Sequence, residues 1–305
     1  MNSKKILLML CGLGLSSPVF ANLNVFACEP EWAALVNTLG GEHVKVTQAT
    51  TALQDPHQIE ARPSLTAKAR IADLLVCTGA DLEGGWLPMI QEKANNPKIL
   101  NGQPGYFMAA DYVKLLDIPA KLDRIHGDVH ADGNPHIQLD PRNYLPIAKA
   151  LSARLAQLDP SHAKTYEANY QGFKKDWESS LVKWEQKAKT LASMPIVVHH
   201  HSWVYLNDWL GLKQISTLEP KPGIPPSASH LSDVYTQVHS EDIKAIICSP
   251  FESQNAAKWL SNKTDIPVVV LPFTVGGSKD ATDLKALFDA TLAQLEMANT
   301  AHAHG

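Results

Sequence analysis

The segment that decides the fold is DPSHAKTYEANYQGFKKDWESSLVKWEQKAKTLASMP, residues 159–195. Asp159 precedes a proline at the first position of a predicted helix, and Pro195 ends the pattern. Large apolar side chains recur between them at steps of three, four or seven, which places them on one face of a helix. They are Tyr166, Tyr170, Phe173, Trp177, Leu181, Trp184 and Leu191. A helix over about 160–192 would be roughly 50 Å long. We expect it to join two lobes as a rigid strut, the alternative being a long surface helix within one domain.

Short apolar runs rich in Val, Ile and Leu lie on both sides of this segment and alternate with stretches of helical character. They cover residues 23–28, 44–47 and 74–77 before it, and 196–199, 245–248 and 268–271 after it. Strands that alternate with helices predict parallel sheets with helices on both faces. We therefore expect an α/β protein with an N-terminal lobe over 22–158, a linking helix over 159–193 and a C-terminal lobe over 194–305.

The composition argues against several classes of protein and points to a metal-binding one. The chain has 305 residues, 45% of them apolar, so it can bury a large core at a size that favours two lobes. Lys and Arg (27) nearly balance Asp and Glu (31), which argues against a nucleic-acid binder with a basic face and against an acidic disordered tail. Thirteen histidines, several of them clumped, are the outlier. Imidazole is the commonest metal ligand.

The first 21 residues have the pattern of a cleavable secretory signal. Two lysines are followed by an apolar run and then by Val-Phe-Ala before Asn22. Cys11 follows Leu10, where a lipoprotein needs a small residue, so we expect no lipid anchor. No later segment approaches the roughly eighteen uninterrupted apolar residues of a membrane span. These features predict a periplasmic protein that begins near Asn22.

Three cysteines remain after the signal, an odd number that permits one internal disulfide at most. Cys28 and Cys77 each close a predicted strand, so they can meet across neighbouring strands of one lobe. Alternatively, all three, including Cys248, are small buried residues. The sequence leaves both possibilities open.

Two short turns repeat one arrangement, an Asx residue, a proline and a histidine, at 55–57 and 134–136. The Asx side chain can bond its own backbone and the proline fixes φ, so each turn presents an imidazole from a stiff loop. A third group, residues 199–201, is a run of three histidines at a predicted strand end. Side chains alternate between the two faces of a strand, so His200 should point opposite to His199 and His201. Only the histidines on one of these faces can line a given cleft. A metal site that uses all three groups would lie between the lobes and clamp them together.

Six segments of the chain keep a common order from residue 55 to residue 212. They are DPHQIEARPSL (55–65), ADLLVCTGADLEGGW (72–86), NPHIQLDP (134–141), IAKAL (147–151), LDP (158–160) and HHSWVYLNDWLGL (200–212). In this combination the chain resembles the periplasmic metal-binding proteins of ABC importers for zinc and manganese (cluster A-I), which include the high-affinity zinc uptake proteins.

The resemblance implies a set of metal ligands and a partner. In that family the histidines of the DPH and NPH segments bind the metal, with a third histidine five positions before a tyrosine. These correspond to His57, His136 and His200, because Tyr205 lies five residues after His200. The resemblance also implies two α/β lobes joined by one long helix, and an inner-membrane ABC permease that accepts the ion. We expect a binding protein that acts as a monomer, with no catalytic residues.

The chain departs from the family pattern in ways that leave the fourth ligand open. The family often has an acidic ligand in an Leu-Asp-Pro stretch near its end, where this chain has Val-Leu-Pro-Phe-Thr at 270–274. Glu252, Asp280, Asp283 or a water molecule could fill that position. The segment 219–231 also differs from the usual pattern, and the histidine-rich insertion of many zinc members is reduced. Its remaining histidines are His126 and His130, with His302 and His304 in the tail.

The ligand types favour zinc as the bound ion. Three neutral imidazoles and one oxygen suit a four-coordinate zinc site, whereas manganese prefers more oxygen ligands. Manganese members of the family carry a carboxylate in place of His200, so the chain resembles the zinc branch. A manganese or other divalent-metal protein of the same family is the first alternative. A secreted zinc metallohydrolase is a more distant one, because the sequence lacks HExxH, GxSxG and a glycine-rich phosphate loop.

Overall fold

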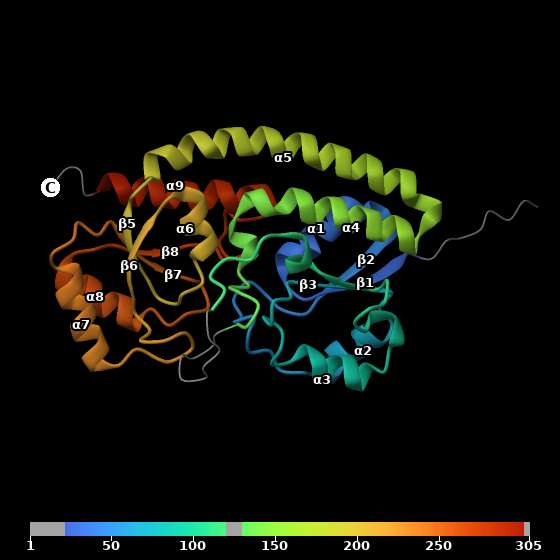
Figure 1. Cartoon of the computed structure of the whole chain (residues 1–305), viewed down its shortest axis with the longest axis horizontal. Helices are drawn as coiled ribbons and strands as arrows, with labels where there is room; N and C mark the ends of the chain where they lie inside the picture. Colours follow the sequence, from blue (N-terminus) through green and yellow to red (C-terminus); the bar gives the residue numbers. More distant parts are fainter. Residues whose placement is uncertain (1–21, 120–129, 302–305) are drawn as a thin grey trace, which may run out of the picture.

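The computed structural model describes residues 22–119 and 130–301 and places its strands in two parallel sheets (Figure 1). The N-terminal sheet has the order β2-β1-β3-β4, with β1 (Leu23–Ala27), β2 (Val44–Gln48), β3 (Leu74–Cys77) and β4 (Tyr106–Met108). The C-terminal sheet has the matching order β6-β5-β7-β8, with β5 (Pro195–Val198), β6 (Lys213–Thr217), β7 (Ala245–Cys248) and β8 (Val268–Val270). The expected α/β fold with two parallel sheets is confirmed.

Helices cover both faces of each sheet, because every strand is followed by a helical segment that must cross back over it. One face of the N-terminal sheet carries α1 (Pro30–Gly40) and α4 (Tyr144–Leu158), and the other carries α2 (Pro63–Arg70) and α3 (Leu87–Ala94). The C-terminal sheet has α6 (Val204–Leu210) and α9 (Leu284–Ala301) on one side. Its other side is covered by α7 (Ala228–Val238) and α8 (Asn255–Thr264).

The long helix predicted from the sequence runs along both lobes (Figure 1). A 3₁₀ turn over Pro160–His162 leads into α5 (Ala163–Leu191). This helix packs on α1 and α4 of the N-terminal lobe and on α6 and α9 of the C-terminal lobe. The carboxylate of Asp159 caps no backbone N–H; it lies 2.6 Å from His162 Nδ1 and accepts a 2.7 Å hydrogen bond from the Tyr166 hydroxyl.

The apolar stripe of α5 belongs to a core that both lobes share. Trp177 contacts Tyr144 of α4 with ring centroids 5.0 Å apart, and its neighbour along the stripe is Trp184 at 5.1 Å. Trp184 in turn packs against Phe288 of α9 at 5.2 Å. An unbroken aromatic core resists deformation because protein interiors are close-packed. The two lobes are thus joined by packed side chains as well as by a helix.

The carboxyl edge of the N-terminal sheet holds a disulfide. Ala27 of β1 pairs with Val76 of β3, so the residues that follow them stand side by side. These are Cys28 and Cys77, and they are bonded to each other. Cys248 at the end of β7 is a free, buried cysteine. The structure therefore selects the first of the two alternatives that the sequence allows for the cysteines.

Several expectations concern residues that the structure does not describe. The proposed signal at 1–21 lies outside the described residues, as do His126, His302 and His304. Within 22–119 and 130–301, no helix combines the length and the apolar character that crossing a bilayer requires.

Candidate metal centre

His57 is held by its own turn in the loop that follows β2. The side chain of Asp55 accepts a 3.0 Å hydrogen bond from the His57 backbone N–H, as the Asx-Pro-His pattern predicts. The same carboxylate oxygen lies 2.8 Å from His57 Nδ1, which leaves Nε2 free to face the site. Burial alone would raise the pKa of Asp55, but the hydrogen bonds with His57 hold that pKa below its usual value. Asp55 therefore both shapes the turn and orients the ring.

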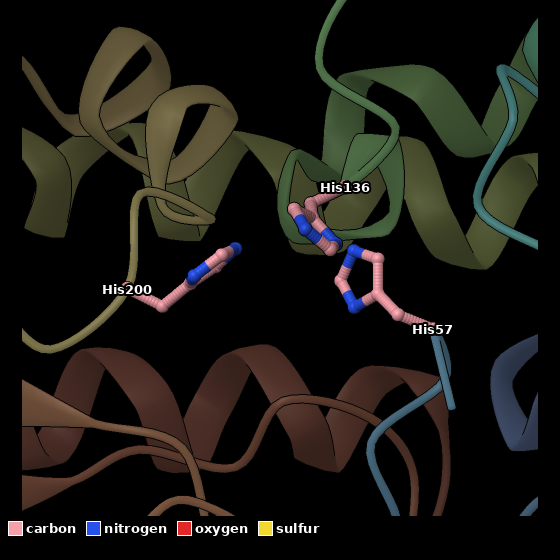
Figure 2. A group of neighbouring side chains, drawn as sticks. All are labelled: His57, His136 and His200. Carbon is pink, nitrogen blue, oxygen red and sulfur yellow. The ribbon is translucent and has the colours of Figure 1, made fainter. Parts of the chain in front are cut away.

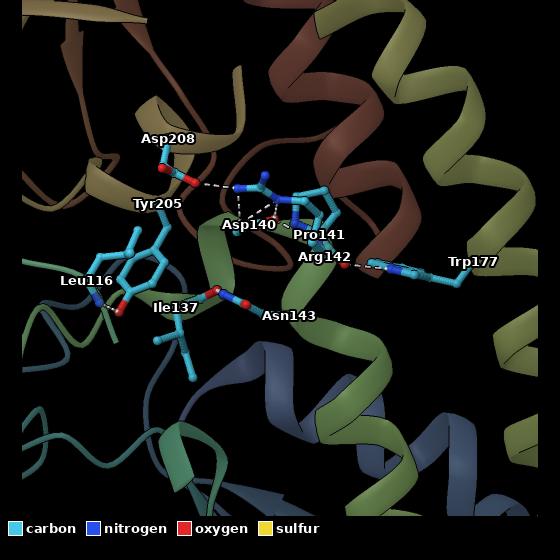
Figure 3. A network of polar contacts seen from close by, with 9 residues as sticks. All are labelled: Leu116, Ile137, Asp140, Pro141, Arg142, Asn143, Trp177, Tyr205 and Asp208. Carbon is cyan, nitrogen blue, oxygen red and sulfur yellow. Dashed lines mark hydrogen bonds and ion pairs between the residues drawn. The ribbon is translucent and has the colours of Figure 1, made fainter. Parts of the chain in front are cut away.

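His136 lies on the second turn of the same kind. The Asn134 side chain accepts a 3.1 Å hydrogen bond from the His136 backbone N–H and donates one of 2.9 Å to the carbonyl of His201. The turn is further tied to the C-terminal lobe by Tyr205, whose hydroxyl donates to the Asn134 carbonyl at 2.7 Å. The same hydroxyl accepts from the Leu116 N–H at 3.0 Å (Figure 3). This explains how the NPH turn is positioned between the lobes.

A salt-bridge network next to this turn also connects the lobes (Figure 3). Arg142, just after the NPH segment, forms a 2.7 Å ion pair with Asp140 and a 2.6 Å ion pair with Asp208 of α6. On the other side, Trp177 of α5 donates a 2.8 Å hydrogen bond to the carbonyl of Pro141. The segment that carries His136 is thus braced against α5 and α6.

The ring of His136 is neutral and buried, which suits a metal ligand. Only 1% of the surface of His136 is exposed to solvent. Desolvation lowers the pKa of His136 well below the usual value, and the neighbouring imidazoles of His57 and His200 lower it further. A histidine must be deprotonated to bind a metal ion. Burial and the neighbouring imidazoles thus favour the neutral form of His136, which is the form that can bind an ion.

The third imidazole comes from the C-terminal lobe, directly after β5. The strand ends at Val198, so the three histidines lie on a bend and not on the strand itself. His200 Nδ1 lies 2.7 Å from Glu219 Oε2, and this carboxylate also accepts a hydrogen bond from a backbone N–H of the loop that follows β6. His201 instead forms a 2.9 Å contact with Asp117 at the surface. His199 is buried and lines the same cavity as His200.

The structure brings His57, His136 and His200 together, as the sequence predicts (Figure 2). One ring nitrogen of each lies within 4.8 Å of the others, and the ring centroids are 5.1, 5.8 and 6.1 Å apart. His57 Nε2 is buried and has no hydrogen-bond partner in the described part of the chain. A buried polar nitrogen without a partner is costly unless a ligand satisfies it. These three side chains form a donor set that can hold a metal ion.

The cavity around this triad is small and lined with acids. Its volume is about 210 Å³, below the size of most pockets for organic ligands but ample for an ion and several waters. The acids that line it are Asp55, Glu219 and Glu252, whereas Asp280 and Asp283 do not line it. Asp283 instead accepts a hydrogen bond from the Ala286 N–H at the start of α9. Burial raises the pKa of Glu252 to about 7.

Glu219 is the residue that the sequence analysis missed. It follows β6, the strand beside β5 at the same carboxyl edge, and ligand-binding side chains gather at such edges in parallel sheets. No strand is predicted from the sequence over 213–217, so the signal that could have identified Glu219, an acid at the end of a strand, was lacking. Phe273 occupies the region in which the family often has its acidic ligand, and its ring packs 5.2 Å from that of His136.

Comparison with known proteins agrees with this geometry. The family model described as zinc-uptake complex component A, periplasmic, matches residues 25–298. The manganese ABC transporter substrate-binding lipoprotein PsaA of Streptococcus pneumoniae is 22% identical over 286 residues, which cover 90% of this chain and 88% of that protein.

Solved structures share the fold at low sequence identity. A crystal structure of ZnuA has a TM-score of 0.76 at 22% identity and covers 91% of this chain and 99% of its own. A zinc-bound ZnuA deletion mutant has a TM-score of 0.74 at 21% identity, with 91% and 97% covered.

These matches decide between the classes of protein considered above. The family model covers most of the chain and describes a component of a transport complex, which confirms a binding protein and rules out the metallohydrolase. Both zinc and manganese occur among the relatives. The chain belongs to the ZnuA family, the extracytoplasmic metal-binding components of ABC transporters.

Proposed function

We propose that this protein captures Zn²⁺ in the periplasm and delivers it, as a monomer, to an inner-membrane ABC permease. The observation that carries the proposal is the convergence of three imidazoles from two lobes on one small cavity. We assign His57, His136 and His200 as the ligands of the transported ion. Two of them face their carboxylate partners through Nδ1, as metal-bound histidines commonly do.

A water molecule is our choice for the fourth position of a tetrahedral site. Asp55 and Glu219 are already engaged with His57 and His200. Asp280 and Asp283 lie outside the cavity lining. Glu252 groups with other donors at the sheet edge and not with the triad. Solvent is therefore the simplest source of the remaining ligand, and it also leaves a route by which the ion can be exchanged.

Manganese is the second candidate ion. The similar protein PsaA is named as the substrate-binding lipoprotein of a manganese transporter, and three carboxylates line the cavity of this chain. Mn²⁺ favours oxygen donors and more than four ligands. The carboxylates nearest to the triad are already hydrogen-bonded to histidines, which argues for zinc.

The experiment is a competition titration of the purified mature protein. We expect Zn²⁺ to bind the triad at least about 100-fold more tightly than Mn²⁺, given the preference of a nitrogen-rich site for zinc. An anomalous-scattering scan on crystals of the loaded protein would identify the ion and count its ligands. Tighter binding of Mn²⁺ would overturn the zinc assignment, and an ion bound away from the three histidines would overturn the ligand assignment.

Export can be tested on the protein isolated from cells. We place the mature N-terminus at Asn22 and expect no lipid on Cys11, although several relatives are named lipoproteins. Intact-mass measurement of the periplasmic fraction distinguishes the two forms. A diacylated cysteine at the N-terminus would contradict the prediction.

A further inference from the structure

A second group of metal-ligand side chains lies at the carboxyl edge of the C-terminal sheet. Val198 of β5 pairs in parallel with Ile247 of β7, and the His199 N–H donates a 2.8 Å hydrogen bond to the Ile247 carbonyl. The next residues in this register are His199 and Cys248. Cys248 packs among residues of α7 and α8, and His199 lines a pocket together with residues of the same two helices.

An acid completes this group from the loop between β7 and α8. Glu252 Oε2 accepts a 2.6 Å hydrogen bond from the Ser249 N–H, which turns its carboxylate back over the sheet edge. One donor atom each of His199, Cys248 and Glu252 lies within 4.8 Å of the other two. The histidine triad lies within the same limit.

One donor of this group, His199 Nδ1, is buried without a hydrogen-bond partner in the described part of the chain, and a second, the Cys248 thiol, is buried and not in a disulfide. His199 is 6% exposed, and its Nδ1 has no hydrogen-bond partner among the described residues. Its other nitrogen, Nε2, lies 3.8 Å from Glu219 Oε1. Cys248 is fully buried and has no cysteine beside it. An unpartnered imidazole nitrogen next to a thiol and a carboxylate is poorly explained by core packing, since unsatisfied buried polar groups destabilise the folded state.

We propose that His199, Cys248 and Glu252 form a second metal site, distinct from the histidine triad, for a thiophilic divalent ion such as Zn²⁺, Cd²⁺ or Co²⁺. Sulfur, nitrogen and oxygen donors together suit such ions, whereas Mn²⁺ and Mg²⁺ prefer oxygen. Donor atoms of a tetrahedral site at normal bond lengths lie about 3.3 to 3.8 Å apart, so the three side chains need to close by at most about 1.5 Å.

The ion can reach this second site through the cavity of the triad. His199 and Glu252 both line that cavity, so an ion entering it meets their donor atoms. When the sulfur–metal bond forms, the thiol releases its proton to solvent, and water fills the remaining position. No oxidant or other reagent is required.

The two sites have separate donor sets and can therefore be tested apart. Co²⁺ added to the wild-type protein in oxygen-free buffer without added thiols is the probe, because Co²⁺ bound to a thiolate gives a strong charge-transfer absorption in the near ultraviolet. We expect two Co²⁺ per chain and this absorption. The Cys28–Cys77 disulfide contributes no thiolate to the signal.

Variants assign the signal to its residues. Cys248→Ser should bind one Co²⁺ and lose the charge-transfer absorption, while His57→Ala/His136→Ala/His200→Ala should bind one Co²⁺ and keep it. His201→Ala, a change at the neighbouring surface histidine, is the matched control and should keep both ions.

Two results would overturn the second site: one Co²⁺ per wild-type chain without thiolate absorption, or saturation with two Co²⁺ without that absorption. Both readings use the wild-type protein and so do not depend on a variant that folds. If the triad variant still bound two Co²⁺, the triad assignment under Proposed function would fail while the second site stood.

Discussion

The carboxyl edges of the two sheets follow one plan with a single decisive difference. In the N-terminal lobe, β1 and β3 end beside each other at Cys28 and Cys77, which are bonded. In the C-terminal lobe, His199, directly after β5, stands beside Cys248, the last residue of β7. Where the first edge has a second cysteine, the other has a histidine.

The correspondence extends to the residues around each cysteine. Glu83 accepts a 2.7 Å hydrogen bond from the Thr78 N–H, directly after Cys77. Glu252 accepts one from the Ser249 N–H, directly after Cys248. The comparison teaches that the same backbone arrangement serves two purposes: a covalent bond closes the edge in one lobe, and a set of metal donors remains in the other.

The lobes also differ in what they give to the triad. The N-terminal lobe provides two imidazoles on stiff Asx-Pro turns, and the C-terminal lobe provides one on a bend after a strand. Under the proposed assignment, this single contribution, His200, is the side chain that would link the ion to the second lobe.

The largest expected effect is on metal affinity when a triad histidine is lost. His57→Ala, His136→Ala and His200→Ala should each weaken Zn²⁺ binding by more than about 100-fold, since changes in residues that merely support a ligand already cost 10- to 100-fold. Calorimetric titration measures this. The control, His201→Ala, should change affinity by less than about threefold, because its ring pairs with Asp117 at the surface. A dispensable His200 combined with an essential His201 would show that the wrong imidazole has been assigned.

The next effect is on stability and separates the two sheet edges. Replacing Cys28 and Cys77 together by alanine should lower the free energy of unfolding by about 2 to 4 kcal/mol, because the bond closes a loop with a sequence separation of 49. Cys248→Ala removes one buried sulfur and should cost about 1 kcal/mol. Urea denaturation of the metal-free protein compares them, and equal losses for both variants would refute the distinction.

The carboxylates that orient the triad come third. Asp55→Asn in one lobe and Glu219→Gln in the other should each weaken Zn²⁺ binding by about 10- to 100-fold, since each contacts a histidine Nδ1 and favours the tautomer that presents Nε2. Competition with a fluorescent chelator gives the two affinities. If only Asp55→Asn had an effect, the bend after β5 would be holding His200 without the help of Glu219.

The smallest effect concerns buried acids of the N-terminal lobe and their pH dependence. Burial raises the pKa of Glu31 to about 7 from 4.5, so the folded protein keeps a proton that the unfolded chain has lost between these values. Stability should therefore fall as pH rises through this window. Glu31→Gln can still accept the hydrogen bond from Thr274 and removes this dependence.

The free energy of unfolding of Glu31→Gln, relative to that of the wild type, should rise by on the order of 1 to 2 kcal/mol between pH 5 and pH 8. Glu92→Gln, on the exposed side of α3, is the control. A difference that stayed constant with pH would show that Glu31 is ionised throughout this range.

Part of this structure could be predicted from the sequence because local patterns encode it. The stripe from Tyr166 to Leu191 predicted one long helix, and the Asx-Pro-His turns at Asp55 and Asn134 have the hydrogen bonds that their residue types favour. These features depend on residues within one or two turns of each other, and that is the range over which backbone preferences act.

Such local patterns do not predict contacts between segments that are far apart in the sequence. The strand predicted to include His199 ends at Val198, and Glu219 was missed as the partner of His200. Glu219 is separated from His200 by a whole helix and strand, and only the parallel pairing of β5 with β6 brings the two together.

By itself, then, the sequence determined the alternation of strands and helices, the strut between two lobes and the stiffness of two histidine turns. The tertiary structure alone decided that Cys28 meets Cys77 while Cys248 meets His199, and that acids from separate loops approach the imidazoles. The physical reason is that register and burial are properties of the packed sheets: a side chain acquires its partners from the strand beside it, and no local pattern specifies which strand that is.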